Sequence, residues 1–355
     1  MGLIGGSLGL ALRRIGYPAR LVGISRPQTI AQALELGVID EGWEYAEMGK
    51  ALQGADLVFL CAPIQRILSL LEEVGALAAP GALITDVGST KRRIAAQAGA
   101  HLRPDLYFIG GHPMAGSEKS GVSAADPFLF QNAIYILVPG KGVPAPLYTA
   151  FAGLLKEIGA KVLEMEAEAH DQVVAAISHL PQMMATSLVK MVGQMDEGNG
   201  VFLTLAAGGF RDMTRIASSP YAPVWEDICR TNADQIGRMI DHYIGVLQEV
   251  RARLEEESLQ GDFAYANRTR SAIPRDAKGF IHTLSEILVV AEDRPGVIAQ
   301  IAQALAQERI NINDIEVMKV REGEGGTLRL GFDSQEAAGH ALKVLAGLGY
   351  QARRR

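Results

Sequence analysis

The fold of the first part of the chain is indicated by Gly2-Leu3-Ile4-Gly5-Gly6-Ser7. This motif leads into the apolar helical pattern LGLALRRIG at residues 8–16. This stretch matches the second half of the G-x-G-x-x-G fingerprint of dinucleotide-binding folds, in which the pyrophosphate lies at a helix N-terminus. Gly2 would let the backbone approach the pyrophosphate, and Gly5 would let the helix pack closely on a strand. A glycine-rich helix start without a nucleotide is the alternative, because the fingerprint is informative only in a βαβ context.

The residues after this motif supply half of that context. Short apolar runs alternate with helical patterns, which predicts a parallel α/β sheet with helices on both faces. The predicted strands are ARLVGIS, ADLVFLCAP, GALITDVGS, LYFIGGHP and AIYILVP. The first strand and first glycine of the fingerprint would lie before Met1. We therefore expect a Rossmann-like sheet without its central strand and a natural start upstream of Met1. The 355-residue form should bind NAD poorly or be insoluble, unless another segment fills the gap.

The chain divides into three predicted domains. Residues 1–140 form the dinucleotide-binding domain. Residues 141–275 are helical after one more predicted strand at 161–165. Long apolar patterns follow at 171–192, where Pro181 predicts a kink, and at 228–254; such helices fit a dimer interface and core packing equally well. Residues 256–282 are polar and are interpreted as a linker. Residues 283–355 follow the order βαββαβ, the ferredoxin-like topology.

The bulk composition excludes several classes of protein. With 48% hydrophobic and 21% charged residues, the chain is expected to fold into sizeable cores rather than stay disordered. The net charge is -6 without a basic tract, so we expect no nucleic-acid partner. No apolar run reaches the ~20 residues that cross a bilayer, so we expect no membrane association. Cys61 and Cys229 are far apart and form neither a disulfide framework nor a metal-binding pattern, which indicates a cytoplasmic protein without a structural metal.

Two predicted strand ends carry candidate catalytic groups. His112 ends one strand, is fixed by Pro113 and is flanked by glycines, which suits a general base because an unperturbed histidine has a pKa of about 6.5. A lone histidine is more often structural or solvated. Ser89 follows the strand ending at Asp86 and offers a hydroxyl where open α/β sheets bind ligands. Ser89 could equally cap the next helix.

Three further segments have both functional and structural interpretations. Ser25 and Arg26 lie at the end of the predicted strand ARLVGIS, where NAD enzymes carry an acidic residue. The pair could accommodate the 2′-phosphate of NADP. Alternatively, Arg26 could stack on adenine or be solvated. The pair Ser178-His179 beside Pro181 could satisfy backbone groups at a kink. Arg215 suits a carboxylate, although Asp212, three residues earlier, could hold it in a surface ion pair.

Together these segments resemble the prephenate dehydrogenase family over residues 1–275. The most specific matches are GHPMAGSE at residues 111–118 and FRDMTRIASS at 210–219. Residues 283–355 resemble an ACT domain, with Asp293-Arg294-Pro295-Gly296 before its first helix and Asn311-Ile312-Asn313 before its next strand. One departure is Gln182, where the family motif S-H-L-P is often followed by a second histidine.

The resemblance implies an NAD-dependent prephenate dehydrogenase of tyrosine biosynthesis, with NADP as a second option for the coenzyme. Hydride would leave C4 of prephenate while His112 takes the hydroxyl proton, and loss of CO2 would give 4-hydroxyphenylpyruvate. Ser89 and His179 would lie near the reacting centre and Arg215 would bind a carboxylate. Further substrate contacts would come from Asp212, Trp225, Ser117 and Glu118. The cofactor contacts would be Gly2, Leu3, Ile4, Gly5, Ser25, Arg26 and Pro63.

The resemblance also implies regulation and assembly. Residues 141–275 would be an all-α dimerisation domain, and the chain a homodimer. The turn at Asp293 to Gly296 suits the carboxylate of an amino acid, and tyrosine would be the effector. The expected effector contacts are Asp293, Pro295, Gly296, Asn311 and Ile312. Arogenate dehydrogenase is one alternative function, and a non-catalytic amino-acid sensor is another.

Overall fold

The computed structural model describes residues 1–116, 119–196, 198, 200–254, 259–273, 284–291, 294–318 and 326–354. Ser117 and Glu118, predicted to contact substrate, and Asp293, predicted to contact the effector, lie outside these ranges. The chain separates into two compact units, Met1–Ser258 and Leu259–Arg355.

The first part of unit 1 is a Rossmann-like α/β domain whose sheet is in two pieces. The first piece pairs β1 (Val22–Ile24) with β2 (Glu41–Trp43). The second has the order β3-β4-β5-β6-β7, with strands Leu57–Leu60, Leu83–Asp86, Tyr107–Pro113, Ile134–Pro139 and Lys161–Glu164. Among the described strands β1 and β3 do not pair, and the break lies where the sequence predicts the missing central strand.

One detail of this sheet differs from the sequence-based expectation. Strand β6 runs antiparallel to β5, so the sheet is mixed rather than wholly parallel. The residues between them, 114–133, contain only the short 3₁₀ helix η2 (Val122–Ala124) among those described, which is too little for the helical crossover that a parallel pair needs. The sheet continues past residue 140, as the strand predicted at 161–165 indicates, because β7 pairs with β6 through Lys161–Glu164.

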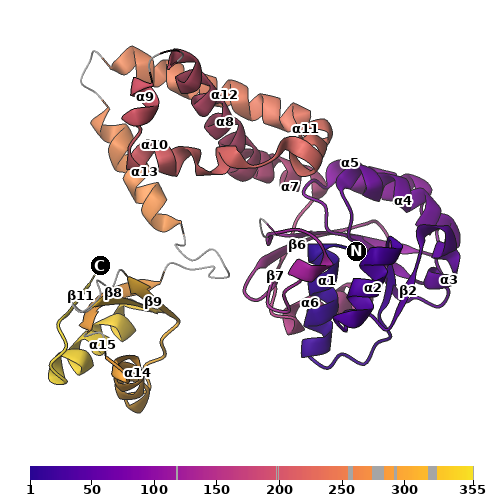
Figure 1. Cartoon of the computed structure of the whole chain (residues 1–355), viewed down its shortest axis with the longest axis horizontal. Coiled ribbons are helices and arrows are strands. Elements are labelled where there is room, and N and C mark those ends of the chain that lie inside the picture. The colour runs from indigo at the N-terminus through magenta and orange to yellow at the C-terminus, as the bar shows by residue number, and fades with distance from the viewer. Residues whose placement is uncertain are drawn as a thin grey trace. The chain divides into compact units, whose positions relative to one another are not determined.

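Helices cover both faces of the larger sheet (Figure 1). Helices α1 (Leu3–Arg14) and α6 (Ala145–Glu157) contribute to one apolar core, and α4 (Ile64–Leu77) and α5 (Arg92–His101) to the other. Successive residues of a strand point to opposite faces, so Leu83 lies in the first core and Ile84 in the second. The smaller sheet is flanked by α2 (Pro27–Glu35) and α3 (Met48–Leu52).

The rest of unit 1 is helical, as predicted. The helices are α7 (Ala167–Val174), α8 (Leu180–Met195), α9 (Val201–Thr204), α10 (Gly208–Thr214), α11 (Glu226–Thr231) and α12 (Ala233–Arg253). The π-turn η3 (Ala175–His179) joins α7 to α8, and Pro181 lies in the first turn of α8, where its missing N–H costs little. The helix predicted at 228–254 is broken at Asn232, which lies between α11 and α12 with a non-helical backbone.

Unit 2 contains helix α13 (Gln260–Ala272) and a ferredoxin-like module. The helix corrects the linker predicted at 256–282: no proline interrupts residues 260–272, so a helix can form there. The module has the expected order β8 (Ser285–Ala291), α14 (Val297–Gln307), β9 (Asp314–Met318), β10 (Gly326–Phe332), α15 (Gln335–Gly347) and β11 (Ala352–Arg354). Its sheet has the order β11-β8-β10-β9. In the described part of the chain, no helix combines the length and apolarity needed to cross a membrane.

Candidate active site

His112 lies near the end of β5, and a buried ion pair fixes the backbone beside it. The Lys91 ammonium donates to the Asp86 carboxylate and to the carbonyl of Gly111, at 2.6 Å for the latter. Asp86 in turn accepts the N–H groups of Gly88 (2.7 Å) and Gly111 (3.2 Å). Asp86 and Lys91 are both fully buried. Because these contacts join the ends of β4 and β5, they fix the direction in which His112 leaves the sheet.

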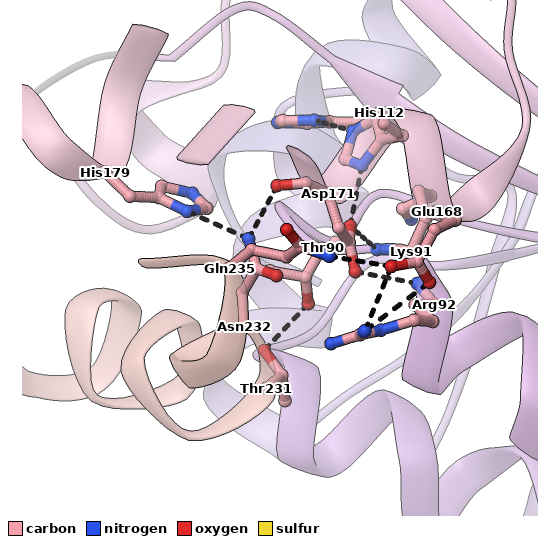
Figure 2. Close-up of polar contacts among 12 residues, drawn as sticks. Thr90, Lys91, Arg92, His112, Glu168, Asp171, His179, Thr231, Asn232 and Gln235 are labelled. Atoms are coloured by element: carbon pink, nitrogen blue, oxygen red, sulfur yellow. Dashed lines mark hydrogen bonds and ion pairs between the residues drawn. The ribbon is translucent and has the colours of Figure 1, made fainter. Parts of the chain in front are cut away.

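The His112 side chain is the end of a hydrogen-bonded chain that starts on α7 (Figure 2). Nδ1 of His112 lies 2.8 Å from Nε2 of His170, and Nδ1 of His170 lies 2.8 Å from Oδ1 of Asp171. The Asp171 carboxylate also accepts the N–H groups of Lys91 (2.7 Å) and Arg92 (3.0 Å) at the start of α5. His170 and Asp171 are fully buried. The α7 pair therefore holds a side chain of the α/β domain.

Burial is the main reason that the pKa of His112 falls well below its usual value, and electrostatic interactions with His170, Lys91 and His179 lower it further. A histidine with a lowered pKa is neutral at neutral pH. It can then accept a proton, as a general base must.

His179 is a second buried histidine in this region. Its Nδ1 lies 3.3 Å from Nδ2 of Asn232, which also donates to the carbonyl of Asp171 at 2.8 Å (Figure 2). The indole of Trp225 meets the His179 ring edge to face, with centroids 6.0 Å apart. Burial lowers the pKa of His179 to about 4, so this ring is also neutral at neutral pH. The structure thus brings together His179 and Trp225, two of the residues that the sequence analysis assigns to the site.

Ser89 lies half-buried in the loop between β4 and α5. It does not cap α5, because the Asp171 carboxylate accepts the N–H groups at that helix start instead. Its neighbour Thr90 shares a 2.8 Å hydrogen bond with Thr231 on α11. The loop that carries Ser89 is therefore anchored to the helical region, and the Ser89 hydroxyl has no hydrogen-bond partner within the described residues.

The Arg215 segment differs from the histidine cluster in exposure. Arg215 begins the 3₁₀ helix η4 (Arg215–Ser218) and is exposed, as is Asp212 on α10. Across the described residues the two form no ion pair with each other, so the surface ion pair considered from the sequence is not formed. Gln182 on α8 is buried and donates to the carbonyl of Ile216 at 3.1 Å. Gln182 thereby ties η4 to α8, the helix that follows His179.

The predicted cofactor residues lie around the start of α1. Gly2 is the N-cap of α1, with open space where a Cβ would stand, whereas a Cβ on Gly5 would lie 3.1 Å from Cβ of Cys61. Helix α1 has no acidic residue in its first turn, so an anion can approach it. Ser25 is buried and its hydroxyl accepts from the N-terminal ammonium of Met1 at 3.0 Å. Arg26, at the N-cap of α2, and Pro63, at the N-cap of α4, are exposed.

The predicted effector residues that the structure describes lie at two places in unit 2. Pro295 and Gly296 precede α14, and Gly296 has a φ of +89°, which favours glycine. Asn311 and Ile312 lie between α14 and β9. On β10 of the same module, the buried guanidinium of Arg329 is held by three carboxylates, those of Glu286, Asp314 and Glu316.

Sequence reasoning missed Lys91, His170, Asp171 and Asn232, which hold the two histidines in place. The signal for the α7 pair was present but weak. His170 and Asp171 are adjacent on a helix and share its buried side with Val174. Adjacent polar residues on the apolar side of a helix are costly unless they are hydrogen-bonded, so such a pair indicates a buried network.

Comparison with protein families gives three consecutive matches. Residues 8–164 match the nucleotide-binding domain of prephenate dehydrogenase, residues 166–265 its dimerization domain, and residues 285–339 the ACT domain. Prephenate dehydrogenase of Bacillus subtilis is 41% identical over 345 residues, which cover 95% of this chain and 91% of the relative. That of Lactococcus lactis is 31% identical over 351 residues, 97% of this chain and 95% of the relative.

Solved structures agree with these matches. Prephenate dehydrogenase of Aquifex aeolicus, crystallised with hydroxyphenyl propionate and NAD+, superposes with a TM-score of 0.69 at 29% identity. The similarity covers 76% of this chain and 93% of that one. Arogenate dehydrogenase of Synechocystis superposes with a TM-score of 0.67 at 31% identity, over 76% of this chain and 95% of that one.

Proposed function

This chain belongs to the prephenate dehydrogenase family, and we propose from that premise how its own residues carry out the reaction. The reaction is the NAD-dependent oxidative decarboxylation of prephenate to 4-hydroxyphenylpyruvate, a step of tyrosine biosynthesis. The observation that carries the assignment of roles is the hydrogen-bonded chain from Asp171 through His170 to His112. It presents a neutral imidazole at the end of a strand, where α/β folds bind their ligands.

In the proposed mechanism His112 accepts one proton from the substrate and later returns it to the product. Nε2 of His112 takes the proton of the C4 hydroxyl, and the O–H electron pair forms the C4 carbonyl as the C4–H bond breaks. Bound NAD+ would supply the acceptor for the hydride that leaves C4. The ring C1–carboxylate bond then breaks, CO2 leaves, and its electron pair makes the ring aromatic. The resulting phenolate oxygen recovers the proton from His112, so no net proton is taken up or released.

The other predicted residues bind and orient the substrate in this proposal. The exposed guanidinium of Arg215 forms a charge-assisted pair with a substrate carboxylate. Of the two roles considered for Asp212, orienting Arg215 and gating access to it, the lack of an ion pair between the two described residues favours gating. His179 and Ser89 line the reacting centre, and Trp225 packs beside His179 to close the pocket. Ser117 and Glu118 complete the substrate contacts. The open approach to Gly2 and the α1 N-terminus fit the pyrophosphate of NAD, with Leu3, Ile4, Gly5, Arg26 and Pro63 beside it. Ser25 is a further cofactor contact in this proposal.

A direct assay tests this function. NADH formation is followed at 340 nm with prephenate and, in parallel, with arogenate, in which an amino group replaces the pyruvyl ketone. We expect turnover of prephenate with NAD+. A preference for arogenate would identify the alternative dehydrogenase, and no turnover of either by a chain with a complete dinucleotide-binding fingerprint would favour a non-catalytic sensor.

Regulation and assembly are part of the same proposal. Tyrosine binds the ACT module at Pro295, Gly296, Asn311 and Ile312, together with Asp293, and the chain is a homodimer through its helical domain. Exposed apolar side chains on that domain support the dimer, among them Met191, Met195, Phe202, Leu203 and Leu247. Cys61 and Cys229, which are both unpaired, support a cytoplasmic location.

Deleting residues 280–355 should leave an active dimer insensitive to an effector. Equal tyrosine inhibition of the deleted form would place tyrosine at the active site only.

A further inference from the structure

We propose that His170 and Asp171 are positioning residues that hold His112 in the single tautomer able to accept a proton from the substrate. The proposal deepens the proposed function and rests on its assignment of His112 as the base. Neither residue need touch the substrate, since both are fully buried and act through the His112 ring.

The order of hydrogen-bond donors in the chain fixes the tautomer. Oδ1 of Asp171 accepts the N–H of Lys91, and Oδ2 accepts the N–H of Arg92, so both carboxylate oxygens act as acceptors. Nδ1 of His170 must therefore carry the hydrogen that it shares with Asp171. In a neutral His170 ring, Nε2 is then an acceptor, and Nδ1 of His112 must donate to it. His112 is left with an unprotonated Nε2, which is the atom that a general base needs.

Without the hydrogen bonds to His170 and Asp171, the proton of His112 would be distributed between the two ring nitrogens, and only one of the two tautomers could act as the base. These hydrogen bonds select that tautomer before the substrate binds. The same hydrogen bonds stabilise the protonated His112 ring that proton transfer produces. Once Nε2 is protonated, the Nδ1 proton can move toward His170, and the positive charge comes closer to the Asp171 carboxylate. A fixed anion near the place where a cation develops stabilises the transition state.

The surroundings of the chain keep Asp171 in one position. Its carboxylate binds the start of α5, a ten-residue helix, and its backbone carbonyl accepts from Asn232 at 2.8 Å. Arg92, next to this helix start, forms ion pairs with Glu168 and Asp234 (Figure 2). The charged and titratable groups around His112 are thus His170 and Asp171 from α7, Lys91 with its partner Asp86, and His179.

Two substitutions of the same residue separate the two contacts of His170. In His170→Asn the amide reaches the position of the ring Nδ1 and can still donate to Asp171, but nothing accepts from His112. In His170→Gln the longer side chain reaches the position of Nε2, so its amide oxygen can accept the His112 proton. We expect kcat for prephenate to fall roughly 10²-fold in His170→Asn, the lower end of the effect of a general base. His170→Gln should recover about tenfold of this loss, and KM should be unchanged in both.

The tautomer itself is measured in the full-length protein without substrate. In a sample with 15N-labelled histidine, NMR chemical shifts distinguish a protonated ring nitrogen from a bare one, and His112→Asn identifies the His112 signals. We expect Nδ1–H and a bare Nε2 in the natural protein, and a mixture of both tautomers in His170→Asn. A proton on Nε2 of His112 in the natural protein would overturn the proposal, as would equal kcat values for the Asn and Gln variants.

The turnover assay and the NMR measurement test the proposed function and the tautomer of His112 separately. The NMR measurement needs no substrate, so it decides the tautomer even where the turnover assay finds that prephenate is not oxidised. If His170→Asn does not fold, which loss of its cooperative unfolding transition would show, the natural protein still gives the tautomer. The kcat of His170→Gln is then compared with that of the natural protein and is expected to be about tenfold lower.

Discussion

The histidine cluster and the Arg215 segment are both parts of the proposed site, yet they are built in opposite ways. Around His112 the partners are buried and hydrogen-bonded in sequence, from Asp171 to the ring that takes the proton. Arg215 lies exposed at the start of a short 3₁₀ helix, and within the described residues its guanidinium has no ion-pair partner. The first region is organised before the substrate binds, whereas the second offers a charge that the substrate itself must pair.

This contrast reflects what each region does. A proton acceptor needs one tautomer and a fixed direction, which only a buried network enforces. A carboxylate clamp gains from remaining unpaired until the substrate arrives, because any internal ion pair would first have to break. Substitutions should therefore divide cleanly, with those in the histidine cluster lowering kcat and those in the Arg215 segment raising KM.

The largest effect is expected for His112→Asn. Removing the general base should lower kcat by about 10²–10⁴-fold, with the KM for prephenate nearly unchanged. Steady-state assays with NAD+ check this, and His101→Asn, an exposed histidine at the end of α5, is the matched control. Near-full kcat in His112→Asn at neutral pH would remove His112 from its role as the base.

Arg215→Ala should raise the KM for prephenate by roughly 10–150-fold, because a charge-assisted hydrogen bond contributes about 1.5–3 kcal/mol. The effect on kcat should be small. Arg211→Ala removes the same charge from an exposed position on α10 and controls for the general electrostatic change. If both variants raise KM equally, the charge of the segment matters and Arg215 has no specific contact.

The pH dependence of kcat/KM tests the electrostatics of the histidine cluster. The pKa of His112 is lowered well below 6.5, chiefly by burial, so the ring stays neutral and active as the pH falls through 6.5. The acid limb should begin below that pH and fall about tenfold per unit, since protonation inactivates the base. An acid limb centred at or above 6.5 would mean that His112 is not shielded from water in the working enzyme.

The smallest effect is expected where the two regions meet. Gln182→Ala removes the hydrogen bond to the carbonyl of Ile216, beside Arg215. A typical hydrogen bond contributes about 0.5–1.5 kcal/mol, so KM should rise roughly 2–12-fold while kcat holds. Gln194→Ala, exposed on the same helix, is the control. A fall in kcat without a change in KM would assign Gln182 to the histidine cluster instead.

Periodicity and motifs predicted most of the fold. The alternation of apolar runs and helical patterns gave the nucleotide-binding domain, and the break between β1 and β3 lies where the glycine turn at Gly2 predicts it. The antiparallel direction of β6 was not predictable, because an apolar run such as AIYILVP has the same pattern in either direction. The helix at 260–272 was missed because polar residues without periodicity favour a linker.

For the site, the residues predicted were those at strand ends and in specific motifs. His112, His179 and Trp225 belong to conspicuous segments, and the structure brings the last two into ring contact. His170 and Asn232 could not be found in the same way. Each acts through a neighbour that is 58 or 53 residues away in the chain, and no local pattern records such a pairing.

The hydrogen bond between His112 and His170 also bears on how this enzyme could be recombined. The nucleotide-binding match ends at residue 164 and the next begins at 166, so a chimera joined at that seam would take its base from one parent and the base's support from the other. Both halves could fold and the hybrid could bind NAD, yet turn over poorly. A functional chimera therefore needs the nucleotide-binding domain and α7 from the same parent, although α7 lies beyond the last strand of the sheet. Shuffled libraries with crossovers after Val174 should therefore contain more active members than those with crossovers at residue 165.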